Sequence, residues 1–322
     1  MQYLGFSLER WVTNQPRKIG DRVANLSRDM GDSAGKEVSL AVEGDVTHRN
    51  PAWTRRAAVA TMVGMRHEEI WHSEAAKEYD TPGKGMFALE VVQPAVDRLA
   101  ELAGDGPALE FAIGTGRVAV PLTERGVRVT GIELSHPMID QLRTKADEGT
   151  IPVIVGDMAT ATAPGKYTLV YLVYNTISNL LTQAEQVACF RNAARHLVPG
   201  GRFVIELWVP ELRNLPTTGQ QAVVFRAEPG YIGVDTYDIL RQHVVSHHFW
   251  FHDGKQPRMF RSPHRYIWPT ELDLMAELAG FELETRHANW SGAEFTAESR
   301  SHVSVYRIPT AQNTHGHLHQ GE

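Results

Sequence analysis

The chain has 322 residues, of which 42% are hydrophobic and 22% charged, and its formal net charge at pH 7 is −6. This composition is typical of a globular protein with one large α/β domain and an appendage, or with two domains. The negative balance gives no electrostatic reason to expect nucleic acid or an anionic membrane as a partner, and no apolar run approaches the ~18 residues that span a bilayer. With Cys189 as the single cysteine, no intrachain disulfide forms, and we expect a soluble cytoplasmic protein.

The two ends of the chain lack regular patterning. Residues 1–64 are polar and poorly periodic, apart from a candidate helix at 54–63, and a more regular segment begins at Met65. We expect a flexible extension there, the alternative being an arm that gates substrate or joins an oligomer. The tail 310–322 ends in HGHLHQGE, which is too short and irregular to form a folded metal site, and we expect it to be disordered.

From Met86 onward strands and helices alternate. Val96, Leu99 and Ala103 mark one face of a helix that ends near Gly104. The predicted strands that follow are 108–113, 127–133, 151–156, 168–174 and 202–208, and the predicted helices between them are 117–125, 137–147 and 182–197, the last ended by Pro199-Gly200-Gly201. This alternation predicts a mainly parallel, doubly wound sheet with helices on both faces.

Residues 210–268 break this pattern. Short runs of aromatic and β-branched residues alternate with Gly, Pro and an Asp253-Gly254 turn signal, which predicts an antiparallel insertion folded over the mouth of the site. After it, Thr270 and Asp273 form a candidate capping box for an amphipathic helix ending at Gly280. Two final strands are predicted at 281–289 and 303–308, the last of them antiparallel to the sheet.

The run LEFAIGTGR, residues 109–117, is the most informative motif. A strand carrying Glu110 leads into a turn with Gly114 and Gly116, a helix follows, and the next strand ends on Glu133. A strand, a glycine turn, a helix and a strand ending in a carboxylate form the half-site for an adenosine-containing cofactor. The glycines allow the backbone to approach the ligand, and the Glu133 carboxylate can accept hydrogen bonds from both ribose hydroxyls.

Two classes of cofactor fit this half-site. Gly114, Gly116 and Ala119 match a dinucleotide fingerprint, so a nicotinamide-dependent oxidoreductase is the alternative, although no Tyr-x-x-x-Lys arrangement is present. A carboxylate at Glu110 would repel a pyrophosphate but would attract a cofactor carrying an ammonium and a sulfonium. Asp157-Met158 after the third strand adds an acid for an adenine amino group and a thioether to pack on the ring.

On these residues, and on the segments VYLVYNTISNLLTQAEQ, HLVPGGRFVIE and RYIWPTELDLMAELAGF, the chain resembles the class I S-adenosylmethionine-dependent methyltransferases over residues 70–309. The resemblance implies a Rossmann-like sheet of six parallel strands and one antiparallel strand, with the insertion between strands 5 and 6. One departure is Ala112, where the family motif usually begins with glycine. S-adenosylmethionine would be the cosubstrate, with no metal, and its binding residues would be Tyr79, Glu110, Gly114, Gly116, Glu133, Leu134, Asp157, Met158 and Tyr174.

The residues that act on the acceptor are less sharply indicated. Asn175 follows the fourth strand, where it either fixes a polar group of the substrate or turns the end of the strand. His247 and His248 are candidate general bases, but neighbours on a strand point to opposite faces, so at most one enters the site. Tyr174, Arg265 and Tyr266 are candidate substrate-pocket residues, with sheet packing as the alternative for the last two.

The sequence therefore predicts transfer of a methyl group from S-adenosylmethionine to an N, O or C atom of a small-molecule acceptor. Methyl transfer is an in-line displacement at an activated carbon, so correct alignment supplies much of the rate enhancement. Nucleic acid and membranes are not expected partners, and a homodimer is compatible with the sequence. The identity of the acceptor depends on the insertion at 210–268.

Overall fold

The computed structural model describes residues 73–215, 221–251, 254 and 256–310. All of them belong to one compact unit, which spans Met62–Glu322. The extension predicted for residues 1–64, with its helix at 54–63, lies outside the described residues, as does 311–322. The described part begins with the short helix α5 (Ser73–Tyr79). Within it, no helix is both long and apolar enough to cross a lipid bilayer.

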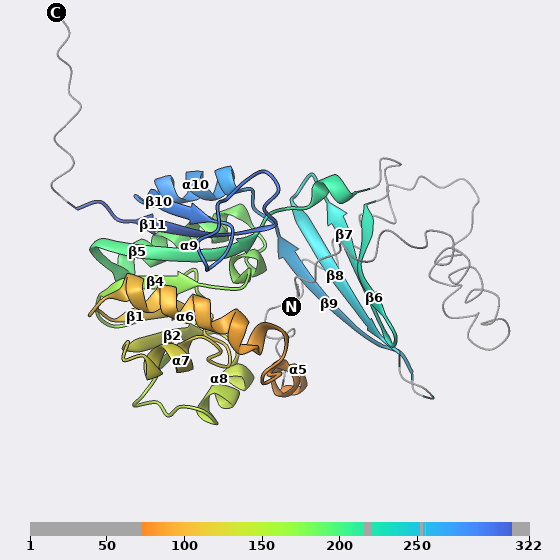
Figure 1. The fold of residues 1–322 in the computed structure, drawn as a ribbon, viewed down its shortest axis with the longest axis horizontal. Helices are drawn as coiled ribbons and strands as arrows, with labels where there is room; N and C mark the ends of the chain where they lie inside the picture. Colours follow the sequence, from red (N-terminus) through yellow and green to blue (C-terminus); the bar gives the residue numbers. More distant parts are fainter. Residues whose placement is uncertain (1–72, 216–220, 252–253, 255, 311–322) are drawn as a thin grey trace, which may run out of the picture. The chain divides into compact units, whose positions relative to one another are not determined.

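The main sheet has seven strands in the order β10-β11-β5-β4-β1-β2-β3 (Figure 1). All neighbouring pairs from β3 to β5 are parallel, whereas β11 is antiparallel to both β5 and β10. Six strands therefore run in one direction and β11 runs against them, as predicted. The strands are β1 (Ala108–Phe111), β2 (Val129–Glu133), β3 (Val153–Val155), β4 (Tyr167–Leu172), β5 (Leu197–Trp208), β10 (Glu282–His287) and β11 (Ser301–Arg307).

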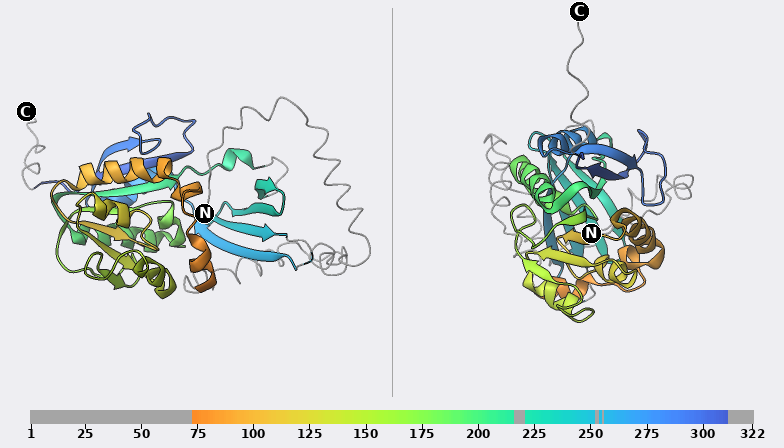
Figure 2. Two further views of the ribbon diagram at one scale, coloured as in Figure 1. Left: turned by 60° about the horizontal axis from the view of Figure 1, so that its bottom comes forward. Right: turned by 90° about the vertical axis from the view of Figure 1, so that its left-hand side faces the viewer.

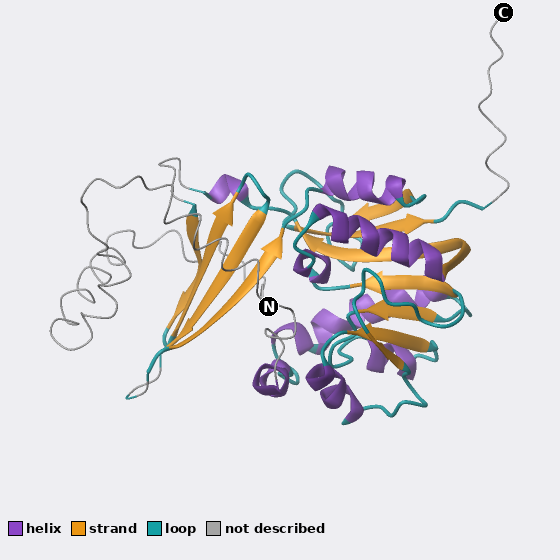
Figure 3. Ribbon diagram, turned by 180° about the vertical axis from the view of Figure 1, so that it is seen from behind, coloured by secondary structure: helices purple, strands orange, loops and turns teal. Residues whose placement is uncertain are grey.

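Helices cover both faces of this sheet (Figures 2 and 3). One buried cluster packs α6 (Leu89–Ala103), α7 (Ala119–Glu124) and α8 (His136–Arg143) against the sheet. The other packs α9 (Gln183–His196) and α10 (Pro269–Leu278) against the opposite face. The predicted α/β architecture is confirmed, since the apolar strands bury both of their faces. Three short 3₁₀ turns complete this part of the fold: η2 (Gly85–Phe87), η3 (Thr176–Asn179) and η4 (Leu212–Asn214).

One predicted helix signal was wrong. The expected capping box of Thr270 and Asp273 does not form: the N-cap of α10 is Trp268, two residues before Thr270, and Pro269 takes the first helical position. Proline is favoured at that position because its fixed φ fits the first turn and its missing N–H is not needed there. Asp273 instead pairs with Arg286 at 2.5 Å. A capping box does start α9, where Thr182 and Glu185 bond reciprocally.

Other observed helix and strand boundaries differ from the predicted ones. The helix predicted at 137–147 ends at Arg143, and the strand predicted from residue 202 already begins at Leu197 and runs through Pro199-Gly200-Gly201. Gly200 N donates to Ile308 O and Ile308 N donates to Gly201 O, so this segment continues the β5–β11 ladder. Tertiary pairing with a distant strand thus overrides the local turn signal.

The insertion forms a separate four-stranded antiparallel sheet in the order β6-β7-β8-β9, as predicted. Its strands are β6 (Ala222–Glu228), β7 (Tyr231–Asp238), β8 (His243–Trp250) and β9 (Arg258–Arg265), and they lie between β5 and α10 in the sequence. The sheet is joined to the α9–α10 layer at its base. There Arg265 pairs with Glu271 at 2.7 Å and donates to Gln186 at 2.5 Å, and His243 Nε2 lies 2.9 Å from Leu181 O.

Candidate active site

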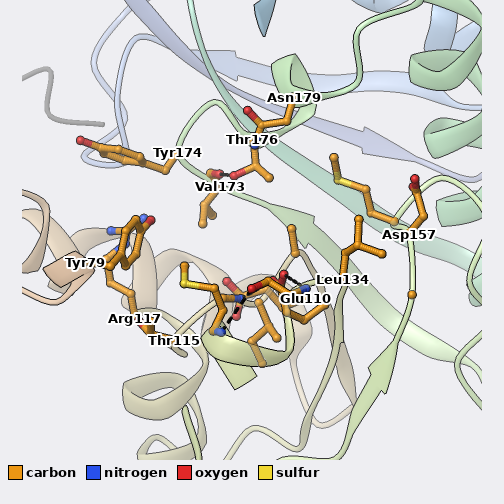
Figure 4. Close-up of a pocket in the computed structure, with 18 of the residues that line it drawn as sticks. Tyr79, Glu110, Thr115, Arg117, Leu134, Asp157, Val173, Tyr174, Thr176 and Asn179 are labelled. Carbon is orange, nitrogen blue, oxygen red and sulfur yellow. Dashed lines mark hydrogen bonds between the residues drawn. The ribbon is translucent and has the colours of Figure 1, made fainter. Parts of the chain in front are cut away.

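A pocket lies at the carboxyl ends of β1, β2, β3 and β4. In an open α/β sheet this edge is where ligands bind. Figure 4 shows Tyr79, Arg117 and Tyr174 at one end of the pocket and Asp157 at the other. The residues that line it are Tyr79, Glu110, Ala112, Ile113, Gly114, Thr115, Arg117, Glu133, Leu134, Ser135, Met138, Gly156, Asp157, Met158, Val173, Tyr174, Thr176, Asn179 and Leu180.

Of the nine residues predicted to bind the methyl donor, Gly116 alone is missing from this lining. Gly114 and Gly116 both have positive φ, 58° and 77°, which favours glycine at each position. A Cβ on Gly116 would overlap the side chain of Leu142 in α8. Gly116 therefore allows the glycine turn to pack closely on α8, while Gly114 faces the pocket.

Glu133 organises the turn with its carboxylate. One oxygen accepts a hydrogen bond from Gly114 N and the other from Ser135 N, each at 2.8 Å. The side chain is buried, and burial raises the carboxyl pKa while the backbone N–H donors oppose the rise. Each carboxylate oxygen keeps a further lone pair, so Glu133 can still accept hydrogen bonds from a ligand's hydroxyls.

Glu110 is buried at the floor of the same pocket. Its carboxyl accepts a hydrogen bond of 2.8 Å from the phenol of Tyr171, a residue of β4. Burial raises the pKa of Glu110 to about 8, opposed by this hydrogen bond and by the positive charge of Arg117. A cation bound next to this carboxyl would lower its pKa and favour its ionised form.

Arg117 is a lining residue that the sequence analysis missed. Its guanidinium lies 4.9 Å from the centre of the Tyr174 ring and donates to Met86 O at 3.2 Å. The signal was available, because Arg117 directly follows the second glycine of the motif, but the expected ligand contacts were assigned to glycines and acids. Arg117 thus adds a cation to a pocket whose carboxyl groups are those of Glu110, Glu133 and Asp157.

Tyr79 is held in the pocket by its neighbour Asp80. One oxygen of Asp80 accepts from the Thr115 hydroxyl at 2.6 Å, and the other pairs with Lys145 at 2.6 Å. These contacts tie the end of α5 to the glycine turn and to the segment that follows α8. The Tyr79 ring packs edge-to-face on Phe87 with a centroid distance of 5.9 Å.

The opposite end of the pocket holds Leu134, Asp157 and Met158. Asp157 accepts from Ala159 N at 2.7 Å, so it also stabilises the turn after β3. Met158 is buried beside it. An acid with free lone pairs between two apolar side chains suits an aromatic base with an amino group.

The corner after β4 adopts a sparsely populated conformation. Tyr174 and Asn175 are consecutive non-glycine residues with φ of 57° and 63°. They are fixed to β5, since Tyr174 N donates to the Glu206 carboxylate at 2.8 Å and Trp208 N donates to Asn175 Oδ1 at 2.7 Å. Asn175 thus ties the two strands together and is not among the lining residues, whereas Tyr174 is.

Ala112 occupies a position where the family motif usually has glycine, and its backbone conformation is unusual for alanine. It has φ of 51° and lines the pocket immediately after β1. An L-residue with a Cβ is strained in this left-handed conformation, which glycine adopts freely. Ala112 therefore has a backbone conformation that suits glycine better than alanine, and Gly114, two residues later, still lines the pocket.

Of the acceptor-side residues named from the sequence, Tyr174 lines this pocket, whereas Asn175, Arg265, Tyr266, His247 and His248 do not. Arg265 is buried in its contacts with Glu271 and Gln186, and Tyr266 packs among Trp208, Tyr237 and Trp268. His247 and His248 lie on β8, His247 3.0 Å from the Thr236 hydroxyl and His248 2.6 Å from the Tyr231 hydroxyl. The structure therefore unites the donor-side residues and leaves these four on the insertion and its base.

Comparison with known proteins agrees with this geometry. A family model described as a methyltransferase domain matches residues 108–201. The solved structure of the CcbJ methyltransferase from Streptomyces caelestis is 35% identical, covers 74% of this chain and 96% of its own, and superposes with a TM-score of 0.64.

Two curated relatives add to this agreement. The cypemycin N-terminal methyltransferase of a Streptomyces species is 25% identical over 249 residues, which are 75% of this chain and 98% of that protein. A dTDP-4-amino-2,3,4,6-tetradeoxy-D-glucose N,N-dimethyltransferase of Saccharopolyspora spinosa is 31% identical over 155 residues, 47% of this chain and 58% of that protein. The present chain has the sheet order described above, a pocket at the carboxyl edge of that sheet, and similarity to CcbJ over nearly all of the CcbJ structure. It therefore belongs to the class I S-adenosylmethionine-dependent methyltransferases.

Proposed function

We propose that this methyltransferase transfers the methyl group of S-adenosylmethionine to an amine nitrogen of a small-molecule acceptor. One observation carries the donor assignment: a buried acid, a cation and a second buried acid, Glu110, Arg117 and Glu133, line a single pocket at the carboxyl edge of the sheet. The donor's amino-acid part carries both an ammonium and a carboxylate, and its nucleoside carries two ribose hydroxyls. Three charged side chains therefore meet three polar parts of one ligand.

In this proposal the methionine part of the donor lies at one end of the pocket and its adenine at the other. Glu110 would take the ammonium and Arg117 the carboxylate of the methionine part, with Tyr79 closing over that end (Figure 4). Glu133 would hold the ribose from the middle of the pocket. Asp157 and Met158, with Leu134, would enclose the adenine at the far end. Each pairing matches charge to opposite charge, or hydrogen-bond acceptor to donor.

The remaining lining residues suit an acceptor that needs no strong base. The donor supplies an electrophilic methyl group, so the protein's main task is to align the nucleophile with it. Among the described lining residues there is no imidazole, thiol or lysine amine, and the three carboxyl groups are engaged with the donor in this assignment. A neutral amine attacks without prior deprotonation and releases its proton afterwards, whereas a hydroxyl gains from a general base.

The relatives support nitrogen as the target. One relative is named as the cypemycin N-terminal methyltransferase, and another is named as an N,N-dimethyltransferase of a dTDP-linked amino sugar. The oxidoreductase alternative gains no support from them. Ionised Glu110 would be stabilised by the ammonium of S-adenosylmethionine but would be repelled by a pyrophosphate. Asn175, His247, His248, Arg265 and Tyr266 lie outside the donor pocket, so any role in catalysis or acceptor binding would lie on the acceptor side.

The proposal is tested in two steps with the full chain. Isothermal titration should show binding of S-adenosylhomocysteine and none of NADH. Incubation with S-adenosylmethionine and matched pairs of small amines and alcohols should then give methylated amines, detected by mass spectrometry, in equal amount to the S-adenosylhomocysteine formed. Methylation of the alcohols alone would refute nitrogen as the target. Binding of NADH in preference to S-adenosylhomocysteine would refute the donor assignment.

A further inference from the structure

The turn after β3, residues 156–163, contains two of the residues assigned to the adenine, and we call it the adenine-side turn. It follows a strand of three residues at the edge of the sheet, where β3 pairs with β2. Gly156 N donates to Glu133 O at 2.9 Å, and beyond this bond Ala161 N donates to Asp157 O at 2.7 Å and closes the turn on itself. In the described part of the chain, the sheet therefore holds only the first residue of this turn.

Three buried residues of α9 face the adenine-side turn. Cys189, Asn192 and His196 are spaced by three and four residues, so they share one face of the helix. Their exposed fractions are 0%, 0% and 2%. Burial raises the pKa of the Cys189 thiol, and the negative charge of Asp157 raises it further, which places this thiol close to the Asp157 carboxylate. The helix thus presents a buried row of polar groups to the turn.

Asn192 binds the turn at two points with one side chain. Its Nδ2 donates to Met158 O at 2.8 Å and to Ala161 O at 2.9 Å. A carboxamide nitrogen has two N–H donors, so both are used. The Oδ1 atom accepts from the Arg195 guanidinium at 2.8 Å, which fixes the orientation of the amide. Asn192 therefore ties a residue of the pocket lining, Met158, to the helical layer behind it.

His196 holds the far end of the turn. Its Nδ1 lies 2.8 Å from Asn192 O, which can only accept, so Nδ1 carries the hydrogen. Its Nε2 lies 2.9 Å from Ala163 N, which can only donate, so Nε2 is the acceptor. Burial lowers the pKa of His196, and the ring packs edge-to-face on Phe111. Both nitrogens of the neutral ring are therefore committed, one to the helix and one to the turn.

We propose that Asn192 and His196 are positioning residues, which set the place of the Asp157 carboxylate and so determine the preference of the pocket for adenine. Asp157 stands at one end of the pocket (Figure 4). A carboxylate there accepts a hydrogen bond from the 6-amino group of adenine and repels the 6-oxo group of hypoxanthine. The inference rests on the proposed function, in which the donor's adenine lies at this end.

The support for Asp157 comes from outside the pocket. Three hydrogen bonds join α9 to the adenine-side turn. A binding group keeps its geometry to within about 0.5 Å only when hydrogen bonds and packing behind it lock it in place. When these bonds are removed, a turn at the edge of the sheet can shift, and the carboxylate then no longer discriminates between the two bases.

The test compares two ligands that differ only in the base. Full-length protein is titrated calorimetrically with S-adenosylhomocysteine and with S-inosylhomocysteine, in which an oxo group replaces the 6-amino group. We expect the wild type to bind S-adenosylhomocysteine at least about tenfold more tightly, because the analogue leaves the carboxylate without its donor. Asn192→Leu and His196→Phe, which keep the branched or ring shape but lose the hydrogen bonds, should each reduce this preference about threefold or more.

Two further variants separate positioning from a general effect on the fold. His196→Gln retains an acceptor oxygen within reach of Ala163 N and should keep a preference close to that of the wild type. Phe190→Leu is the matched control, because Phe190 lies on the same helix but packs on Phe203 and Tyr306. It should lower the melting temperature by leaving a cavity, yet it should retain the full preference for adenine.

The outcomes that overturn the proposal are distinct from those that overturn the proposed function. An unchanged preference in both Asn192→Leu and His196→Phe would overturn it, as would an equal reduction in Phe190→Leu or in His196→Gln. Equal affinity of the wild type for the two ligands would also overturn it, while the binding of S-adenosylhomocysteine would leave the donor assignment standing. Failure of the wild type to bind S-adenosylhomocysteine would instead remove the proposed function itself.

Discussion

Tyr171 donates a hydrogen bond of 2.8 Å to Glu110, and both side chains are buried beneath the donor pocket. The arrangement keeps an acid in a place where its charge is costly until a ligand cation arrives. Burial raises the pKa of Glu110 to about 8, from an ordinary value of 4.5. Between these values the folded chain holds a proton that the unfolded chain releases. The contribution of Glu110 to the free energy of unfolding therefore falls as pH rises through this range.

Glu110→Gln should become progressively more stable relative to wild type between pH 5 and about pH 8, because the amide cannot ionise. The difference in melting temperature between the two proteins should widen with pH and level off above about pH 8. Exposed Glu101→Gln is the control and should track the wild type at every pH. Parallel melting curves for Glu110→Gln and wild type would show that the buried acid does not titrate in this range.

Arg117 and Glu133 should affect different parts of the donor. Arg117→Met should weaken binding of S-adenosylhomocysteine by about tenfold or more, because a charged hydrogen bond is worth roughly 1.5–3 kcal/mol. It should leave 5′-methylthioadenosine, which lacks the amino-acid part, unaffected. Glu133→Gln should weaken both ligands, since both carry the ribose. Calorimetric titration of the two ligands against each variant separates these outcomes.

Asp140→Asn, an exposed change on α8, is the control for Glu133→Gln and should alter neither affinity. If Arg117→Met weakened both ligands equally, the guanidinium would be maintaining the shape of the pocket through its contacts with Tyr174 and Met86. The assignment of the carboxylate to Arg117 would then be wrong.

Ala112→Gly should stabilise the protein by about 0.5–1 kcal/mol. The left-handed conformation costs an L-residue about 1–2 kcal/mol, and the extra backbone entropy of glycine in the unfolded chain offsets part of that gain. Urea denaturation measures the difference. Ala100→Gly in the middle of α6 is the opposite control and should destabilise by about 1 kcal/mol. Equal losses at both positions would mean that Ala112 is not strained.

Gly116→Ala should destabilise the protein more than Gly114→Ala. At Gly114 a methyl group meets Met138 at an ordinary 3.5 Å, whereas at Gly116 it overlaps Leu142. Shortening Leu142 to alanine should make the Gly116 substitution less costly, although Leu142→Ala alone costs about 2–5 kcal/mol. A double-mutant cycle measures this coupling. Additive losses would place the cost of Gly116→Ala in the backbone conformation alone.

The donor half of the site was predictable because its signals are local. Glu110 and Gly114 lie within five residues of each other, and Glu133 closes the following strand, so one strand–turn–helix–strand unit contains most of that assignment. Parallel strands bring their carboxyl ends to one edge of the sheet. Because Asp157 and Tyr174 follow such strands, this rule alone was enough to predict that they join the donor half of the site. Arg117 was overlooked within this same unit, because its role depends on the ring of Tyr174 from a distant strand.

The acceptor half was not predictable in the same way. Arg265 resembled a pocket residue in the sequence, yet Gln186 and Glu271, contributed by two different helices, give it a buried structural role. Asn175 likewise has its partner, Trp208, 33 residues away. The sequence by itself determined the alternation of strands and helices and the glycine turn, because hydrophobic periodicity and backbone freedom are properties of short segments, whereas the count of six parallel strands and one antiparallel strand came from the family resemblance. Only the tertiary structure decided which polar side chains were already satisfied by protein partners and which remained available to a ligand, because hydrogen bonds between distant segments exist only once those segments are packed together.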